Sequence, residues 1–466
     1  MQTTLTTASN WAASEFAGAE LGDKRRCRRL IRVAGALAQA PHGTLPSSFG
    51  GWAESKAAYR LLDMPDVCYE HLVAPHLCHV QAACHRPGEY LLIEDTTSLD
   101  FTSHASVSDL GRIGNDGGRG LFLHSMLALK IERWNRDNEP EVTVEGLFHQ
   151  HWWARTEPSL GSDREKKSKR LNRDRESQRW AAITEKVGAP PQGTQWTYMA
   201  DRESDIYEVF QYCRKHDWRF IIRASQPRAL SDEDGSVFTR VAESPELGGF
   251  TVDLRARPGQ AARQARLVIR SCTLSLRGPW RPGGAPGPLP LSVVEALEID
   301  APKGAKVIHW VLLSNWPCVS FTEAARVIKA YTRRWLIEEY HKCLKSGTKI
   351  EASQLSTAQH ITALLGILAV VAVRLLKTKL LASTLPDEAV SSGSLGSDIL
   401  AVLQSKFGQP PGGWTHGSLL RAIARLGGFL ARKNDGSPGW NTIWRGWRKL
   451  MLLTQGFELA KGENCG

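Results

Sequence analysis

The chain has 466 residues and a formal net charge of +11, from 59 lysines and arginines against 48 aspartates and glutamates. This length is sufficient for a large core in about two to four domains, and the basic balance favours a polyanionic partner. Nine cysteines without a CxxC pair exclude a disulfide framework and predict reduced thiols in a cytoplasmic protein. The longest apolar run, residues 363–373, is too short to cross a bilayer, so we expect a soluble protein with no membrane partner.

Residues 1–70 are predicted to form a small helical module. Asp23 precedes a run with six basic residues in nine, 24–32, on a helix whose other face is apolar. A helical module with one strongly basic helix suits docking on DNA phosphates or in a groove. The alternative is a solvated basic surface without a partner.

Two predicted strands each lead into an aspartate. The first, residues 90–95, is an apolar run that ends at Asp95, and strands at 121–131 and 141–149 follow it in a meander. The second, 195–200, ends at Asp201 and is followed by a helix and a further strand at 219–223. Neighbouring strands of an α/β sheet would bring the two carboxylates to one edge. A strand-end aspartate can equally be a turn or cap residue.

Two long segments interrupt this pattern. Residues 161–180 are rich in charges of both signs and form either a solvated helix or arm, or a DNA contact. Residues 224–320 show strand patterns with turns and a loop at 278–290 that holds five prolines and four glycines, which indicates a β insertion. Trp310 lies in the last strand of this insertion, where packing in the core is the alternative to a functional role.

One helix is expected to run through residues 331–345. Ser320 and Glu323 form a capping box upstream, and neither proline nor glycine follows before Gly347. At about 100° per residue, one narrow stripe of this helix carries a phenol, a carboxylate and three cations. Those residues are Tyr331, Arg334, Glu338, Lys342 and Lys345. The alternative is a solvated face with ordinary ion pairs such as Glu338–Lys342.

The last part of the chain is predicted to be helical. A strongly apolar helix at 361–381 is expected to pack on the sheet, and the polar segment 383–397 has the composition of a linker. Two amphipathic helices follow at 419–430 and 440–453, the second with three tryptophans. They suit either dimerisation or a cap on the core.

Asp95, Asp201 and Glu338 together suggest a chemistry. Three such acids can bridge two divalent ions about 3.5–4 Å apart, of which one activates water or a 3′-hydroxyl and the other stabilises the leaving oxygen. Mg²⁺ suits this arrangement because it binds few carboxylates together with substrate phosphates. Arg334, Lys342 and Lys345 would hold the other phosphates of a polynucleotide.

At these residues the sequence resembles the DDE transposases of bacterial insertion sequences, in the YREK-bearing group to which the transposase of transposon five belongs. The YREK pattern is complete in Tyr331, Arg334, Glu338 and Lys345. The segments 93–98 and 201–203 match those that hold the family's first two acids. Further similarity covers most of the chain, at 21–23, 58–60, 149–153, 422–429 and 440–447.

The resemblance implies an α/β fold with an RNase-H-like mixed-sheet catalytic core, a β-rich insertion and helical domains at both ends. The implied domains are 1–70 for DNA binding, 71–380 for catalysis with the insertion at 224–320, and 381–466 for dimerisation. It implies metal-dependent cut-and-paste transposition through a nick, a hairpin and strand transfer. Two Mg²⁺ ions, for which Mn²⁺ substitutes, and a homodimer on double-stranded inverted-repeat ends and target DNA are expected, in the bacterial cytoplasm at the nucleoid.

The resemblance also implies roles for single residues. Asp95, Asp201 and Glu338 are the metal-binding catalytic acids, and Trp310 stacks a flipped base. DNA contacts are further implied for Arg223, Tyr331, Arg334, Lys342, Lys345, Arg25, Arg26, Arg28 and Arg29. A catalytically inactive DNA-binding descendant of a transposase, a general nuclease with an RNase-H-like core and a purely structural basic protein are the alternatives.

Overall fold

The structure is a computed structural model that describes residues 7–49, 51–104, 106–114, 117–155, 180, 185, 187–232, 234–254, 261–280, 284–390, 397–432 and 435–463. The mixed-charge segment for which DNA contact was left open falls outside these ranges except for Trp180. Residues 391–396 of the expected linker also fall outside them.

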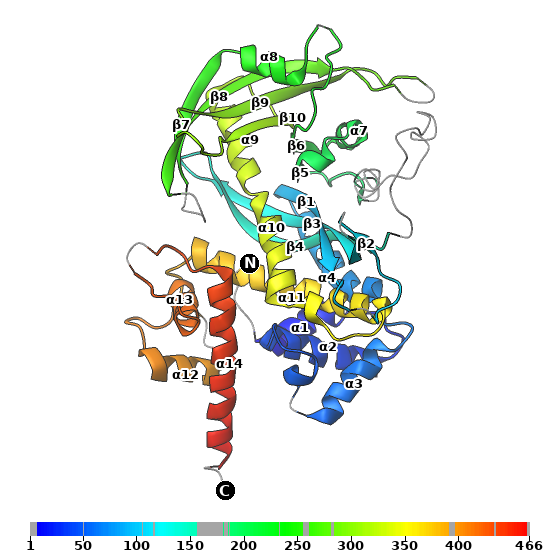
Figure 1. Cartoon of the computed structure of the whole chain (residues 1–466), viewed down its shortest axis with the longest axis vertical. Coiled ribbons are helices and arrows are strands. Elements are labelled where there is room, and N and C mark those ends of the chain that lie inside the picture. The colour runs from blue at the N-terminus through cyan, green and yellow to red at the C-terminus, as the bar shows by residue number, and fades with distance from the viewer. Residues whose placement is uncertain are drawn as a thin grey trace.

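A ten-stranded mixed sheet lies at the centre of the molecule (Figure 1). Its strands are β1 (Gly88–Asp100), β2 (Gly111–Ile113), β3 (Gly118–Trp134), β4 (Pro140–Trp153), β5 (Thr194–Ala200), β6 (Arg219–Arg223), β7 (Glu246–Leu254), β8 (Arg263–Leu276), β9 (Leu289–Ile299) and β10 (His309–Ser314). The order is β2-β3-β1-β5-β6-β10-β9-β8-β7, with β4 paired to β3. β4, β3 and β1 are antiparallel, whereas β1, β5 and β6 run parallel. This RNase-H-like order confirms the predicted fold class.

The β insertion extends the same sheet. Its last strand, β10, pairs antiparallel with β6, and Leu312 lies opposite Arg223. Strands β9, β8 and β7 then continue outward, with α8 (Val237–Glu243) against β8 and β9. The insertion therefore brings Trp310 of β10 to the neighbourhood of Arg223 at the end of β6.

Four helices form the N-terminal region beside the core (Figure 1). They are α1 (Ala8–Phe16), α2 (Lys24–Gln39), α3 (Trp52–Leu62) and α4 (Tyr69–Cys84). Asp23 caps α2 by accepting a hydrogen bond from the backbone N–H of Arg25 at 2.7 Å. Because Leu30, Val33 and Leu37 of α2 are buried, its basic residues are left at the surface.

The apolar helix after the central segment is α11 (Ala358–Thr384), and α2, α4 and β4 all contact it. Among the described residues, α11 alone is long and apolar enough to cross a membrane by length and composition. Its most apolar stretch is 78% buried within the protein, as in the central helix of a core.

The C-terminal helices are α12 (Ser397–Phe407), α13 (His416–Leu426) and α14 (Trp440–Glu463). The helix expected at 419–430 ends at Leu426 instead, because Gly427 and Gly428 follow it and Gly428 adopts a positive φ of 95°. Gly446 lets α14 cross α13 closely, since a Cβ there would lie 1.7 Å from the carbonyl oxygen of Ile423.

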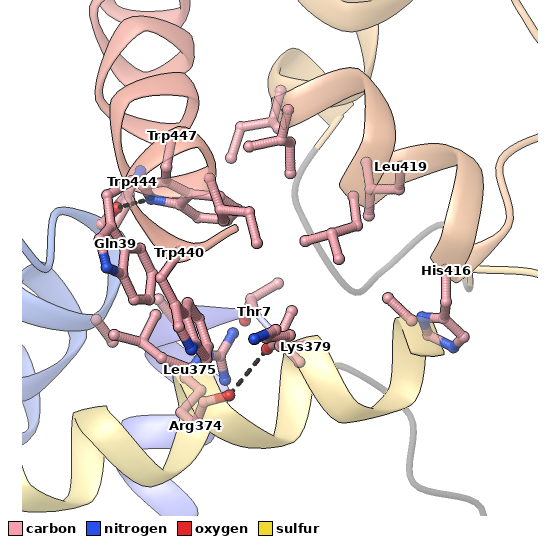
Figure 2. Close-up of a pocket in the computed structure, with 18 of the residues that line it drawn as sticks. Thr7, Gln39, Arg374, Leu375, Lys379, His416, Leu419, Trp440, Trp444 and Trp447 are labelled. Atoms are coloured by element: carbon pink, nitrogen blue, oxygen red, sulfur yellow. Dashed lines mark hydrogen bonds between the residues drawn. The ribbon is translucent and has the colours of Figure 1, made fainter. Parts of the chain in front are cut away.

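The tryptophans of α14 face inward, so the first half of this helix is a cap on the core. The indole N–H of Trp440 donates to the carboxylate of Glu339. That of Trp447 donates to the carbonyl oxygen of Gln39 at 3.0 Å (Figure 2). A cavity of about 190 Å³ remains between α1, α2, α11, α13 and α14. The second half of α14 exposes Leu452, Leu453 and Leu459.

Candidate active site

Strand register brings Asp95 and Asp201 together. β1 and β5 run parallel up to the pair Glu94 and Ala200, so each aspartate directly follows the last paired residue of its strand. The expectation that the first strand ends at Asp95 is wrong, because β1 continues to Asp100 and Asp95 lies opposite Ser125 of β3. Asp95 instead marks the point where pairing with β5 ends, which leaves its side chain beside Asp201.

A short turn fixes Asp201. It precedes the 3₁₀ helix η2 (Arg202–Ser204), and its carboxylate accepts the backbone N–H of Glu203 at 2.8 Å. The α-helix expected to start at Ser204 is α7 (Tyr207–Lys215). Asp201 therefore has the cap function of a strand-end aspartate, and its charge also acts on Asp95.

The third acid, Glu338, is carried by a helix that differs from the expected one. Two helices, α9 (Phe321–Thr332) and α10 (Trp335–Lys342), replace the single helix, and a π-helical turn, η3 (Cys343–Gly347), follows them. At the junction, Arg334 N–H donates to the carbonyl oxygen of Tyr331, three residues back, at 3.0 Å. A 3₁₀ turn advances about 120° per residue instead of 100°. This tighter winding lets both Tyr331 and Ile337, six residues apart, face the core.

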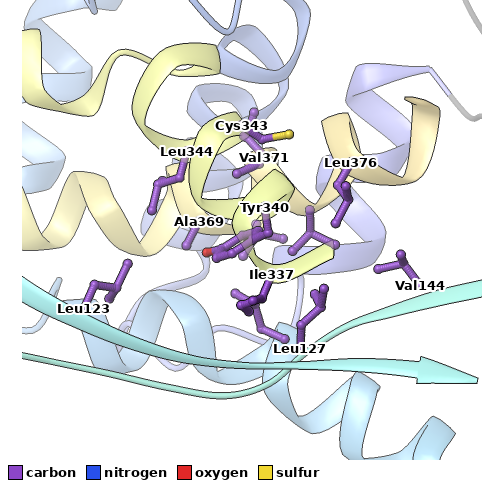
Figure 3. Packing of buried hydrophobic residues seen from close by; sticks show 14 of the residues in the cluster. Leu123, Leu127, Val144, Ile337, Tyr340, Cys343, Leu344, Ala369, Val371 and Leu376 are labelled. Atoms are coloured by element: carbon purple, nitrogen blue, oxygen red, sulfur yellow. The ribbon is translucent and has the colours of Figure 1, made fainter. Parts of the chain in front are cut away.

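The buried face of α10 anchors Glu338. Ile337, Tyr340 and Leu344 are buried between β3 and α11, where Figure 3 shows them against Leu123 and Leu127. A polar network adds direction, because Gln150 Nε2 donates to the hydroxyl of Tyr340 at 2.8 Å and to Ser125 Oγ at 2.7 Å. Ser125 lies opposite Asp95 in the sheet, so the network ties α10 to the strand pair that carries the first acid.

Arg334 lies between two of the three acids. Its Nη1 is 3.9 Å from Asp95 Oδ2, and its Nη2 is 3.3 Å from Glu338 Oε1. Burial, followed by the negative charges of Glu338 and Asp201, raises the pKa of Asp95 to about 7, although Arg334 opposes this. The negative charges of Glu338 and Asp201 therefore both act on the Asp95 carboxylate. Asp95 itself is buried, with 8% of its surface exposed.

The chemical type of these three side chains suits a divalent cation. Within the described ranges, no three His, Cys, Asp or Glu side chains already lie close enough to hold an ion, since Arg334 provides the positive charge between the acids. Their donors are carboxylate oxygens, which Mg²⁺ prefers. Burial is the first cause of the raised pKa of Asp95, and the second is the repulsion by Glu338 and Asp201, which a dication would relieve.

An aromatic and cationic cluster lies next to the acids. The rings of Trp310 and Tyr331 are 5.4 Å apart and nearly perpendicular, and the guanidinium of Arg334 is 6.0 Å from the ring of Tyr331. Arg223 Nη2 donates to the carbonyl oxygen of His309 at 2.8 Å. Burial lowers the pKa of Arg223, as do Arg202 and Arg334, so this arginine lies within the field of the cluster.

One lysine of the expected stripe lies elsewhere. Lys345 Nζ donates to the carbonyl oxygen of Ser98 at 2.8 Å and lies 3.2 Å from Glu351, because the π turn rotates it toward the end of β1. Lys342 is exposed and lies one turn after Glu338 on α10. The single helix is therefore wrong, and with it the expected place of Lys345, whereas Tyr331, Arg334 and Glu338 meet near the two aspartates.

The arginines of the basic helix α2 differ in exposure and in their partners. Arg25 and Arg28 are exposed and Arg29 is half-buried. Arg26 instead donates to the carbonyl oxygen of Leu21 at 3.0 Å and pairs with Asp66 at 2.9 Å. Arg26 thus holds the N-terminal module together, which leaves the other three arginines accessible to a ligand.

Glu94 is a buried residue that sequence reasoning missed. One of its carboxylate oxygens lies 2.7 Å from His124 Nε2, and the other accepts the hydroxyl of Tyr198. Tyr198 in turn lies 2.7 Å from the hydroxyl of Ser204, and His124 Nδ1 lies 2.7 Å from Thr96 Oγ1. Glu94 therefore links the strand of Asp95 to the turn after Asp201. The signal was a second acid in the middle of an apolar strand.

Three segments of the chain match known transposase domains. Residues 8–67 match the transposase DNA-binding domain, 176–374 the transposase DDE domain, and 406–464 the transposase Tn5 dimerisation domain. The DDE match contains Asp201 and Glu338 and begins after Asp95. Among solved structures, the chain is similar to a piggyBac transposase in a synaptic complex with hairpin DNA, at 12% identity and a TM-score of 0.36, over 83% of this chain and 74% of that one.

Proposed function

Because the chain carries the DNA-binding, DDE and dimerisation domains of a DNA transposase, we propose that it moves a DNA element by cut-and-paste transposition. We further propose that the chain is a member of the YREK-bearing group. It binds the inverted-repeat ends of its element and cleaves them through a nick and a hairpin. It then joins the 3′ ends to target DNA. The convergence of Asp95, Asp201 and Glu338 on Arg334 is the observation that carries the proposal.

In this proposal Asp95, Asp201 and Glu338 hold two Mg²⁺ ions, and Mn²⁺ substitutes for them. Such ions, when bound, make water or a 3′-hydroxyl nucleophilic and stabilise the leaving oxygen. Arg334 releases the carboxylates and takes up phosphate oxygens of the DNA strand, for which its planar guanidinium is suited. Its place between Asp95 and Glu338 puts that phosphate next to the acids.

The neighbouring residues position the strand. Arg223 and Tyr331 hold the phosphate of the displaced nucleotide, and Trp310 stacks on its base once it leaves the duplex. The perpendicular contact with Tyr331 supports this role, since it fixes one edge of Trp310 and leaves the half-buried indole in place. Lys342 and Lys345 contribute positive charge farther along, and Arg25, Arg28 and Arg29 of α2 contact the end sequence.

The active form is proposed to be a homodimer on two DNA ends. The exposed Leu452, Leu453 and Leu459 on the second half of α14 provide an apolar face for the second subunit. The first half of α14 is used within the chain. The DNA substrate implies action at the bacterial nucleoid.

The test is cleavage of a duplex that carries the inverted repeat flanking the gene. Glu338→Ala should bind this duplex as the wild type does and lose Mg²⁺-dependent cleavage. Glu388→Gln, which removes an exposed acid far from the site, is the matched control and should cleave normally. Cleavage by Glu338→Ala would contradict the catalytic assignment.

A catalytically inactive DNA-binding descendant of a transposase is the second candidate. It would bind the flanking repeat and show no cleavage even as the wild type. The complete set of three acids favours the enzyme, since a binding protein has no need to bury Asp95 against two other carboxylates.

A further inference from the structure

A strongly basic pocket lies outside the candidate active site, where three distant parts of the chain meet. It measures about 400 Å³ and is formed by the loop after α2, the turn after the π-helical segment and the first half of α14. Its lining is His42, Ser346, Lys349, Asn441, Trp444, Arg445 and Arg448. No acidic residue is among them, so every charge in the lining is positive.

The walls of this pocket are held by close packing. A Cβ on Gly347 would lie 2.9 Å from the ring of Trp444, so glycine lets α14 approach the turn that carries Ser346 and Lys349. The rings of His42 and Trp444 are 5.3 Å apart and nearly perpendicular, which fixes the loop after α2 against the same tryptophan. Trp444 is thus a buried floor and is not available for stacking on a base.

The cations of the pocket lack negative partners. In the ranges that the structure describes, Lys349, Arg445 and Arg448 form no ion pair, and all three are exposed. Burial lowers the pKa of His42 to about 4, and the charges of Lys349 and Arg448 contribute to this. His42 lies against the backbone of Trp444, and neither ring nitrogen makes a hydrogen bond of normal geometry to a described residue.

The backbone at Lys349 is also unusual. Its φ of 54° and ψ of 38° lie in the left-handed region, which non-glycine residues seldom adopt. Such a conformation is strained and persists where the surroundings require it, often at ligand clamps. Here it ends the π turn and directs the Lys349 side chain into solvent at the pocket.

We propose that this pocket binds a phosphate group of the DNA backbone, so that one strand contacts the N-terminal region, the core and α14 at the same time. Arginine, lysine, serine and asparagine side chains offer N–H and O–H donors, and a phosphate accepts them without a competing carboxylate. The pocket is open and has no free aromatic face, which suits a phosphate on a polymer better than an enclosed nucleotide. The inference rests on the proposed function, since it assigns a further contact to the same substrate.

The first experiment measures DNA affinity against salt. Each phosphate contact contributes about 0.9 to the slope of log K against log [salt], so Arg445→Gln with Arg448→Gln, which removes this contact, should reduce its magnitude by about 0.9. Lys406→Gln with Lys449→Gln removes the same charge from exposed positions of the C-terminal helices outside the pocket, and should change the slope far less. Equal slopes for the two double variants would overturn the proposal.

The second experiment identifies the source of the phosphate by acetylation of Lys349 in the full-length wild type, read by mass spectrometry. The duplex with the flanking repeat should protect Lys349 severalfold, whereas inorganic phosphate at the same ionic strength should not. Equal protection by inorganic phosphate would make this a site for a free anion and overturn the DNA assignment, as would no protection at all.

Measurements on the wild type distinguish failure of the phosphate pocket from failure of the proposed transposase function. If it binds and cleaves the flanking repeat while Lys349 stays unprotected, the pocket inference alone fails. If it shows no cleavage of that duplex, the proposed function fails, and protection of Lys349 by DNA would still support a phosphate contact in a DNA-binding protein.

Discussion

Replacing Asp95 by asparagine should stabilise the metal-free protein above neutral pH. In the folded protein, burial and the charges of Glu338 and Asp201 raise the pKa of Asp95 from 3.8 to about 7. In the unfolded chain the same carboxyl ionises near its ordinary value. Between these two values the unfolded chain has released the proton and the folded protein has kept it. The free energy of unfolding of the wild type therefore falls as the pH rises through this window.

The size of the effect follows from the pKa. At 1.36 kcal/mol for each pKa unit, the rise at Asp95 corresponds to a loss of about 4 kcal/mol of stability above neutral pH. Unfolding entropy is about 2.1 cal/mol/K per residue, so for 466 residues unfolding as one unit the loss is about 4 °C in Tm. Asp95→Asn keeps the shape of the side chain and cannot ionise, so this loss is absent from the variant.

Thermal unfolding in a chelator, followed by circular dichroism across the pH range, measures this difference. The Tm of Asp95→Asn minus that of the wild type should be close to zero near pH 4 and rise to about 4 °C above pH 7. Glu338→Gln removes one source of the repulsion and should shift the rise to lower pH. Adding Mg²⁺ near pH 8 should raise the Tm of the wild type more than that of Asp95→Asn. Parallel curves for the wild type and Asp95→Asn would refute the reasoning.

Three further changes test other parts of the molecule. Glu94→Ala breaks a buried pair with His124 and should cost about 3–5 kcal/mol in urea unfolding, whereas a loss below about 1 kcal/mol would show that the network is dispensable. Gly446→Ala places a Cβ against the carbonyl of Ile423 and should destabilise the α13–α14 pair by about 1–3 kcal/mol. Gly456→Ala, with open space around it on the same helix, is the control and should stabilise by up to about 1 kcal/mol; equal effects at the two glycines would contradict the close crossing. Trp310→Ala should still nick the flanking repeat and form less hairpin, and an unchanged hairpin yield would exclude its role in holding a base.

Much of the fold could be predicted because it depends on local patterns. The continuous apolar run 90–93 is typical of a strand that is buried on both faces of a sheet, and β1 contains it. Ser320 and Glu323 satisfy each other's backbone donors, so α9 starts where the capping box predicts. Alternation of strand, helix and strand around Asp201 implied parallel neighbours, and β5 and β6, on either side of α7, pair in parallel.

The candidate site could be predicted only in part. The acids were found because each has a distinct local context, and Arg334 was expected beside Glu338, but its place beside Asp95 was not. A uniform helical period placed Lys345 beside Glu338, whereas the π turn after Lys342 redirects that side chain toward Ser98 and Glu351. The tight turn at Arg334 lets both Tyr331 and Ile337 reach the core, and that core depends on packing between α10, β3 and α11.

Local chemistry along the chain therefore decided which segments became strands and helices. Tertiary structure alone decided that Arg334 is the cation between Asp95 and Glu338, that Glu94 joins two strands behind them, and that His42, Lys349 and Arg448 share one pocket. The reason is physical, since hydrogen bonds along a helix or strand depend on neighbours in sequence. Burial and charge–charge energies depend on residues hundreds of positions apart, and they exist only once the chain has folded.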